Sequence, residues 1–269
     1  MRFLIQIFLS LLICAVGYAH GDLHERIVQL SKQIKQKPNL DSLYVMRGQL
    51  YYFHTDYANA EKDFFTAVKL GYTGEDINYW QARLCLDMEK YNRGITHIST
   101  YLSCYHNDVS AIRIYAQLLS ANCDFNQAAD YYQKVIALTS GVLPKNYLEL
   151  VAALQQANRF DEAAEWLKNG IDRLGSLPAF QTALIALYRQ QNNVDGILTI
   201  YRQQVKQANR KETYYYKLAE LYDELGKADS AYLYLNQATM AVNQLPLHIK
   251  QTLAMQQLMT NIKKKRGAI

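Results

Sequence analysis

The chain has 269 residues, of which 50% are hydrophobic and 20% are charged, so it can bury a sizeable core and is not a disordered segment. Its formal net charge of +5 comes from Arg2 and the run Lys263–Arg266, and the remaining basic and acidic residues are equal in number. Nucleic-acid-binding proteins usually carry a basic face through the domain, so this distribution argues against a nucleic-acid partner.

The first predicted element, residues 1–19, is a cleaved signal peptide. Arg2 gives it a positive start, residues 3–16 form an apolar run, and small residues precede the expected cleavage after Ala19. The run of about 14 residues is shorter than the roughly 20 that span a bilayer, which disfavours a membrane anchor. We therefore expect a periplasmic or secreted protein with no transmembrane segment after cleavage.

A lipoprotein signal is the other alternative for this segment. Cys14 would be the lipidated residue, but Ile13 stands where such a signal has a small residue. The sequence N-x-S/T, which marks glycosylation sites, is absent from the chain, which favours a bacterial periplasm over eukaryotic secretion.

Residues 20–40 are predicted to form an N-terminal capping helix. Within it, Leu23–Lys35 places Ile27, Leu30 and Ile34 on one side of a helix, as an amphipathic helix requires. These apolar residues would cover the first unit of the region that follows.

The histidines at this end carry a second, metal-based hypothesis. After cleavage His20 is the first residue, and its free amine and imidazole lie about one helical turn from His24, an arrangement that can bind copper or zinc. Two histidines near a chain end rarely complete a coordination shell, and a frayed terminus is the simpler interpretation.

The central region, residues 41–245, repeats one pattern with a period near 34. It begins in the stretch DYANAEKDFFTAVKLGY, which spans Asp56–Tyr72. Small or aliphatic residues of the first half recur at Gly48, Ala82, Ala116, Val151, Ile185 and Ala219, with larger residues three positions later. In the second half, Ala60, Gly94, Ala128, Ala163, Ile197 and Ala231 recur, followed four residues later by Phe64, Ile98, Tyr132, Leu167, Tyr201 and Leu235.

All four prolines agree with this register. Pro144 and Pro178 begin the fourth and fifth units, Pro246 follows the sixth, and Pro38 precedes the first. Proline is tolerated in the first turn of a helix and breaks its interior, so these residues mark boundaries.

After cleavage the chain has three cysteines, Cys85, Cys104 and Cys123, none of them spaced as in a zinc or redox motif. An odd number leaves at least one thiol unpaired in an oxidising compartment. We expect small buried side chains at these positions.

These residues resemble the tetratricopeptide repeat family, which has a period of 34, an alanine in the second helix and a closing aromatic. The first unit, YVMRGQLYYFHTDYANAEKDFFTAVKLGY, carries the resemblance best, and the fifth departs from it at Ile197. The resemblance implies an all-α, right-handed superhelical solenoid of about six helix pairs with capping helices. Residues 246–269 would supply the second cap, a helix over Leu247–Lys264 with Ile249, Leu253 and Ile262 on one side, and a basic tail.

The resemblance also implies a concave surface formed by the first helix of each pair. Its exposed positions in the family's register are Gln49, Tyr52, Tyr79, Arg83, Arg113, Gln117, Gln155, Arg189, Tyr216 and Glu220. Arg83 and Arg113 occupy adjacent units and are expected to hold a carboxylate or phosphate together, unless they form ion pairs within the array. The lysine and asparagine set by which some relatives clamp a terminal carboxylate is not matched.

The expected function is that of a non-catalytic adaptor that binds a protein or peptide in the cell envelope. The chain has no glycine-rich phosphate loop, no G-x-S-x-G elbow and no H-E-x-x-H motif, so neither an enzyme nor a cofactor is expected. The alternative is a periplasmic metal-binding protein that uses His20 and His24.

Overall fold

The computed structural model describes residues 22–269, and every regular element in this part of the chain is a helix. The predicted signal peptide and His20 lie outside the described residues. The chain divides into two compact units, the first ending at Trp166 and the second beginning at Leu167.

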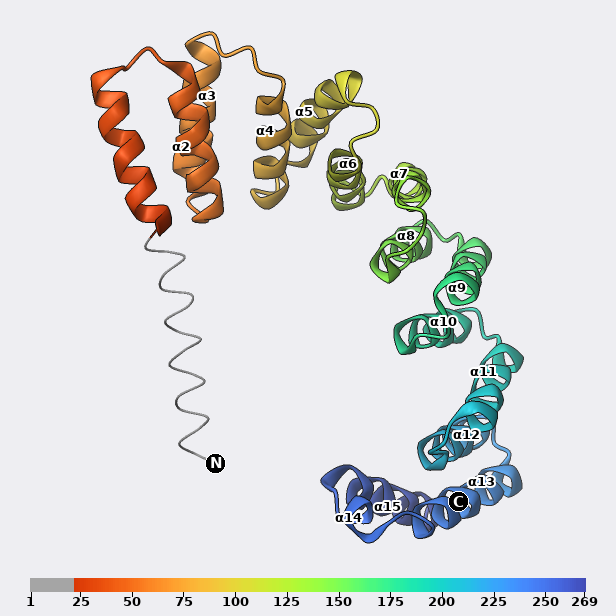
Figure 1. Ribbon diagram of the computed structural model, residues 1–269. Coiled ribbons are helices and arrows are strands. Elements are labelled where there is room, and N and C mark those ends of the chain that lie inside the picture. The colour runs from red at the N-terminus through yellow and green to blue at the C-terminus, as the bar shows by residue number, and fades with distance from the viewer. Residues whose placement is uncertain (1–21) are drawn as a thin grey trace, which may run out of the picture. The chain divides into compact units, whose positions relative to one another are not determined.

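The helices follow one another with short connections (Figure 1). Residues 22–36 are helical and precede α2, and Ile27, Leu30 and Ile34 in this helix are buried. The helices that follow are α2 (Asp41–Phe53), α3 (Tyr57–Lys69), α4 (Asp76–Asp87), α5 (Tyr91–Cys104), α6 (Val109–Ala121), α7 (Phe125–Leu138), α8 (Pro144–Gln156), α9 (Phe160–Leu174), α10 (Pro178–Gln190), α11 (Val194–Gln207), α12 (Glu212–Glu224), α13 (Ala228–Asn243), α14 (Leu247–Lys250) and α15 (Leu253–Arg266).

Helices α2 to α13 follow one another as six successive helix–turn–helix segments, which confirms the predicted all-α repeat fold. In the first unit α2 packs on α3, α4 on α5 and α6 on α7, while the first helices α2, α4 and α6 also contact their neighbours. In the second unit α10 packs on α11 and α12 on α13, and α13 contacts α15. Because one pair cannot bury both of its apolar faces, stacking makes the core continuous within each unit.

The repeating positions of the second helices form this core. Ala60, Ala128, Ala163 and Ala231 are fully buried, as are Phe64, Ile98, Leu167 and Leu235. Among the first helices, Ala82, Ala116 and Ala219 are fully buried as well. Ile185 is an exception, because it is only half buried and Leu184 and Leu187 fill the interior of α10 instead.

Glycine at two of these positions permits close helix contacts. A Cβ atom on Gly48 would lie 2.7 Å from Cε1 of Phe64, and one on Gly94 would lie 2.6 Å from Cδ2 of Leu118. Real Cβ atoms do not approach other atoms so closely, so a larger residue at either position would push the helices apart.

The turns within the pairs also repeat. Each has one residue with a positive φ angle, and these residues are Thr55, Glu89, Cys123, Asn158, Asn192 and Gly226, at φ between 54° and 67°. Only the last is glycine, the residue to which this left-handed conformation is easily accessible.

The prolines lie where the register places them. Pro144 and Pro178 are in the first turns of α8 and α10, and Pro246 precedes α14. Pro38 lies between the helix over residues 22–36 and α2.

The C-terminal helix differs from its prediction. It is divided into α14 and α15 by Gln251 and Thr252, and Thr252 has an extended backbone with ψ of 146°. The break resets the helical register, so Leu253 is 77% exposed while Met255, Leu258 and Ile262 are buried against α13. The predicted stripe through Leu253 is therefore wrong, although Ile249 and Ile262 do pack on this core.

The cysteines divide into two classes. Cys85 is buried as expected, but Cys104 and Cys123 are exposed, and all three are free thiols. The expectation of burial is wrong for these two because Cys104 ends α5 and Cys123 lies in the turn after α6.

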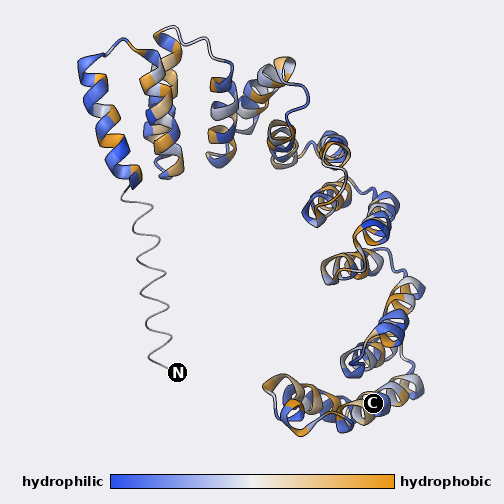
Figure 2. Cartoon of the chain, in the orientation of Figure 1, coloured by the Kyte–Doolittle hydropathy of each residue, from blue (hydrophilic) through white to orange (hydrophobic). Residues whose placement is uncertain are grey.

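Hydrophobic and hydrophilic residues alternate along the helices in both units (Figure 2). Within residues 22–269, no helix is long and apolar enough to cross a membrane.

Candidate binding groove of the first helices

A cavity of about 310 Å³ opens over the first helices of the first three pairs. We call it the first-helix groove. Its lining comes from α2, α4 and α6 and consists of Tyr52, Tyr79, Arg83, Leu86, Asp87, Ser110, Arg113, Ile114 and Gln117. The structure thus brings together five of the residues that the repeat register predicts: Tyr52, Tyr79, Arg83, Arg113 and Gln117.

Tyr52 and Tyr79 form an aromatic wall of the groove, and their rings pack on Trp80. The Tyr52 and Trp80 rings meet edge to face at 6.0 Å between centroids, and Tyr79 meets Trp80 in the same way at 5.6 Å. Phe53, whose side chain is half exposed, also contacts Trp80 edge to face. This geometry is favourable for aromatic pairs and holds the rings rigidly.

The Arg83 guanidinium lies over this wall. Its carbon is 4.9 Å from the centroid of Tyr52, 5.2 Å from that of Trp80 and 5.8 Å from that of Tyr79. Cation–π contacts of this kind hold the guanidinium without neutralising it. Among the described residues, no carboxylate forms an ion pair with Arg83, so its charge remains available.

Arg113 is in a different state, because it is already paired. Its guanidinium donates to Oε2 of Glu149 and, at 2.9 Å, to Oδ1 of Asn146, both on α8. Asn146 is buried and donates in turn to Oγ1 of Thr139 at 2.9 Å. Arg113 therefore follows the alternative of an ion pair within the array, whereas Arg83 has no carboxylate partner among residues 22–269.

Tyr52 and Asp87 form a second fixed contact in the groove. The Tyr52 hydroxyl donates to Oδ2 of Asp87 at 2.5 Å, which links α2 to the end of α4. Burial, together with this hydrogen bond, raises the pKa of Tyr52 to about 12, so the phenol stays protonated at neutral pH. The hydroxyl is thus committed to Asp87.

The remaining predicted residues lie outside the groove. Gln49 on α2 and Gln155 on α8 are half buried and do not line it. Arg189, in the second unit, forms an ion pair with Glu224 at 2.9 Å.

Tyr216 and Glu220 are also in the second unit, one turn apart on α12. Tyr216 packs on the core of α13 and α15, and burial followed by the nearby Glu220 raises its pKa to about 12.

Several residues of the groove are absent from the set that the repeat register predicts. Asp87 lies one helical turn from Arg83 on α4, and Ser110 lies one turn from Arg113 on α6. This spacing could have predicted that each shares a helix face with its arginine. Trp80 is next to Tyr79 in the sequence, yet only the packed structure shows its ring under Arg83.

The metal hypothesis gains no support from the described residues. His24 is exposed on the helix over residues 22–36. Between residues 22 and 269, no group of three or more histidine, cysteine, aspartate or glutamate side chains is placed to hold a metal ion.

Comparison with known proteins bears on the fold. A tetratricopeptide repeat family model matches residues 212–241, the sixth helix pair, whereas the sequence pattern is clearest in the first. No curated protein sequence matches the chain significantly.

Solved structures share the architecture at low sequence identity. The C-terminal part of a tetratricopeptide repeat-containing protein from Cytophaga hutchinsonii superposes with a TM-score of 0.62 at 16% identity, covering 84% of this chain and 95% of that one. A tetratricopeptide repeat protein from Parabacteroides merdae gives a TM-score of 0.55 at 12% identity, with coverages of 90% and 93%. YrrB, described as a TPR protein with an unusual peptide-binding site, gives 0.52 at 16% identity, covering 59% of this chain and 81% of its own. The family model thus identifies one tetratricopeptide repeat at residues 212–241, and the superpositions show that the chain shares the all-α fold of solved tetratricopeptide repeat proteins.

Proposed function

We propose that this protein is a non-catalytic scaffold that binds a protein or peptide through the first-helix groove. Proteins with tetratricopeptide repeats are generally protein-interaction scaffolds, and the similar structure of YrrB is described as having a peptide-binding site. The observation that carries the proposal is Arg83, a cation held over three aromatic rings without a carboxylate partner among the described residues.

The chemistry of the groove favours a ligand that carries a carboxylate next to an apolar group. Arg83 would donate charge-assisted hydrogen bonds to the carboxylate, and Tyr79 and Ile114 would contact the apolar part. Ser110 and Gln117 offer hydrogen bonds to a peptide backbone. Rigid aromatic surface around an arginine is the composition typical of binding hot spots.

We further propose that the protein acts in the cell envelope after removal of residues 1–19. The support is the charged start, apolar run and small residues of that segment. Fractionation of cells followed by N-terminal sequencing tests it, and we expect a periplasmic or secreted protein that begins at His20. An uncleaved, cytoplasmic chain would contradict this location and leave the groove unaffected.

Site-specific crosslinking tests the groove. A photoreactive amino acid replaces Gln117, which lines the groove, or Gln127, an exposed residue on α7 that does not. We expect a crosslinked partner from position 117 alone. In the Arg83→Gln protein this adduct should decrease at least tenfold, a loss of about 1.4 kcal/mol of binding free energy.

Arg26→Gln is the matched control. Arg26 is an exposed arginine on the helix over residues 22–36, so the substitution changes the net charge equally and leaves the groove intact. If the adduct persists in the Arg83→Gln protein, or decreases equally in the Arg26→Gln protein, the partner does not bind in the groove.

A further inference from the structure

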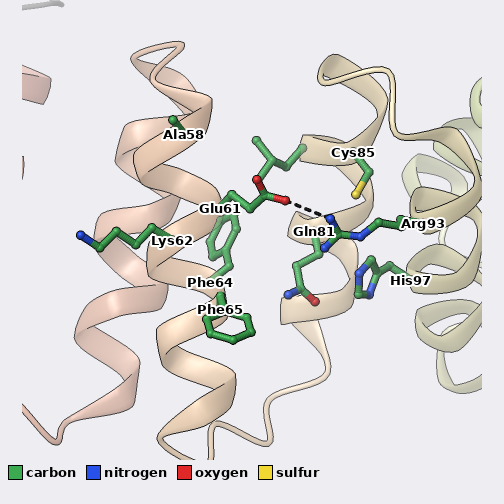
Figure 3. A pocket seen from close by; sticks show the side chains of 10 residues that line it. Ala58, Glu61, Lys62, Phe64, Phe65, Gln81, Cys85, Arg93 and His97 are labelled. Atoms are coloured by element: carbon green, nitrogen blue, oxygen red, sulfur yellow. Dashed lines mark hydrogen bonds and ion pairs between the residues drawn. The ribbon is translucent and has the colours of Figure 1, made fainter.

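A second cavity of about 310 Å³ lies on another side of α4, between the second helices α3 and α5. We call it the second-helix pocket. Figure 3 shows Phe64 and Phe65 on one wall, Arg93 and His97 on the opposite wall, and Gln81 and Cys85 between them. The pocket shares no lining residue with the first-helix groove, so it is a separate feature of the first unit.

The apolar wall of the pocket is exposed to solvent. Phe65 is 67% exposed, although Phe64 beside it is fully buried. Leu84 and Cys85, both buried, extend the apolar surface inward from α4. An exposed phenyl ring at the mouth of an apolar hollow favours a ligand with a large apolar side chain, and the volume is at the lower end of the range for ligand sites.

The rim of the pocket carries excess positive charge. Glu61 accepts from Nη1 of Arg93 at 3.1 Å (Figure 3) and also from Nζ of Lys90 at 2.8 Å, so one carboxylate is shared by two cations. The Arg93 side chain is 60% exposed, so most of its donors face solvent. A carboxylate on a ligand would therefore be attracted to this rim.

The interior of the second-helix pocket contains uncharged polar groups. Gln81 is half buried between Phe65 and His97 (Figure 3), and its amide makes no hydrogen bond to other described residues. Nδ1 of His97 lies 3.1 Å from Oδ1 of Asn78. Burial, and then the positive charge of Arg93, lowers the pKa of His97, so the imidazole is neutral at neutral pH.

The second unit has a cavity at the equivalent position, but with different chemistry. It has a volume of about 470 Å³ and lies between α9 and α11 over α10. Three repeats after the second-helix pocket, Lys168 takes the position of Phe65 and Gly196 takes that of Arg93. The exposed ring and the arginine are therefore particular to the pocket of the first unit and are not a consequence of the repeat.

We propose that the second-helix pocket is an additional docking site, which binds an aromatic side chain of a partner protein segment with an acidic residue beside it. The aromatic ring packs against Phe65 and Leu84, with the Gln81 amide at its edge. The acidic residue pairs with Arg93, which has the excess charge. This inference goes beyond the proposed function, because it concerns a site on another side of α4 that shares no lining residue with the first-helix groove and functions whether or not that groove is occupied.

Peptide display on the full-length mature protein tests the inference. Random 12-residue peptides are selected on the unaltered protein, and their affinities are then measured against four variants. We expect a consensus with an aromatic residue next to Asp or Glu, and at least tenfold weaker binding to Phe65→Ala and to Arg93→Gln. Val68→Ala, another exposed apolar residue on α3 that does not line the pocket, and Arg83→Gln in the first-helix groove should bind as the unaltered protein does.

Because Phe65 and Arg93 are largely exposed, both variants should keep their helical circular dichroism and melting temperature, which verifies the fold. If one of the two variants, Phe65→Ala or Arg93→Gln, fails to fold, the peptide affinity of the other still tests the inference. Peptides that depend on Phe65 and Arg93 but have no acidic residue in their consensus would overturn the inference. Selection of no peptide that depends on Phe65 or Arg93 would overturn it as well.

Discussion

The residues with positive φ in the turns within the helix pairs introduce local backbone strain at single positions. A residue with a side chain in this conformation costs roughly 1–2 kcal/mol relative to the right-handed region, and β-branched residues fit it worst. Thr55 has φ of 61° in the first turn, and it is exposed. The sixth turn uses Gly226 at the same position, which avoids the cost.

Thr55→Gly is therefore expected to stabilise the protein. Relief of the strain exceeds the greater backbone entropy of glycine in the unfolded chain, so we expect a gain of about 0.5–1 kcal/mol in the free energy of unfolding. Chemical denaturation measures it. Thr73→Gly is the control, since Thr73 is also an exposed loop threonine but has no positive φ, and it should give no gain.

Gly48→Ala is expected to have the opposite effect. The added Cβ would lie 2.7 Å from the ring of Phe64, which is fully buried. Overpacking of this kind costs about 1–3 kcal/mol, although alanine is the better helix former.

Thermal or denaturant unfolding of Gly48→Ala measures this loss, and a double substitution verifies its cause. In the Gly48→Ala/Phe64→Leu protein the smaller side chain makes room for the methyl group, so the two losses should not add. Additive losses would show that Phe64 is not the obstacle.

At the scale of helices, Glu61 connects neighbouring repeats. It lies on α3 and pairs with Lys90, which precedes α5, and with Arg93 on α5. The hydrogen bond from Lys90, followed by the positive charges of Lys90 and Arg93, lowers the pKa of Glu61 below its ordinary value of 4.5, against the effect of burial. The native state therefore holds the proton less tightly than the unfolded chain.

The sign of the pH dependence follows from this difference. Stability from the Glu61 contacts is present above about pH 4.5 and is lost as the pH falls through the lowered native pKa. Because the side chain is one-third exposed, we expect Glu61→Gln to cost less than about 1 kcal/mol at pH 7. Unfolding curves from pH 7 to pH 3 should show the two proteins converging below pH 4.5, and a constant difference would exclude the ion pairs as its source.

At the scale of the molecule, the division into two compact units leads us to expect that destabilisation of one unit leaves the other folded. In a stacked array each repeat contacts only its neighbours, so a local change in stability should spread over a limited distance. We expect Gly48→Ala to increase amide hydrogen exchange in α2 to α4 and to leave α12 and α13 unchanged. Exchange measured by mass spectrometry on peptides from both units tests this, and equal increases in both would indicate a single cooperative unit.

Much of this architecture follows from the sequence by itself. The period near 34, the small residues such as Ala60 and Ala82, and the prolines at 144 and 178 predict helix pairs, their order and most of their buried faces. Each of these signals is local, because spacing within a helix decides which side chains share a face. The resemblance to the repeat family also implies a set of exposed positions on the first helices, and five of these residues line the first-helix groove.

Only the tertiary structure decides the state of those residues. Arg113 is neutralised by Glu149, a residue 36 positions later, while Arg83 lies over Trp80 and keeps its charge. Likewise the break before Leu253 and the exposed ring of Phe65 have no counterpart in the repeat pattern. Periodicity determines which face a side chain occupies, but its partners and the free space beside it depend on three-dimensional packing between neighbouring helices, which a one-dimensional pattern does not contain.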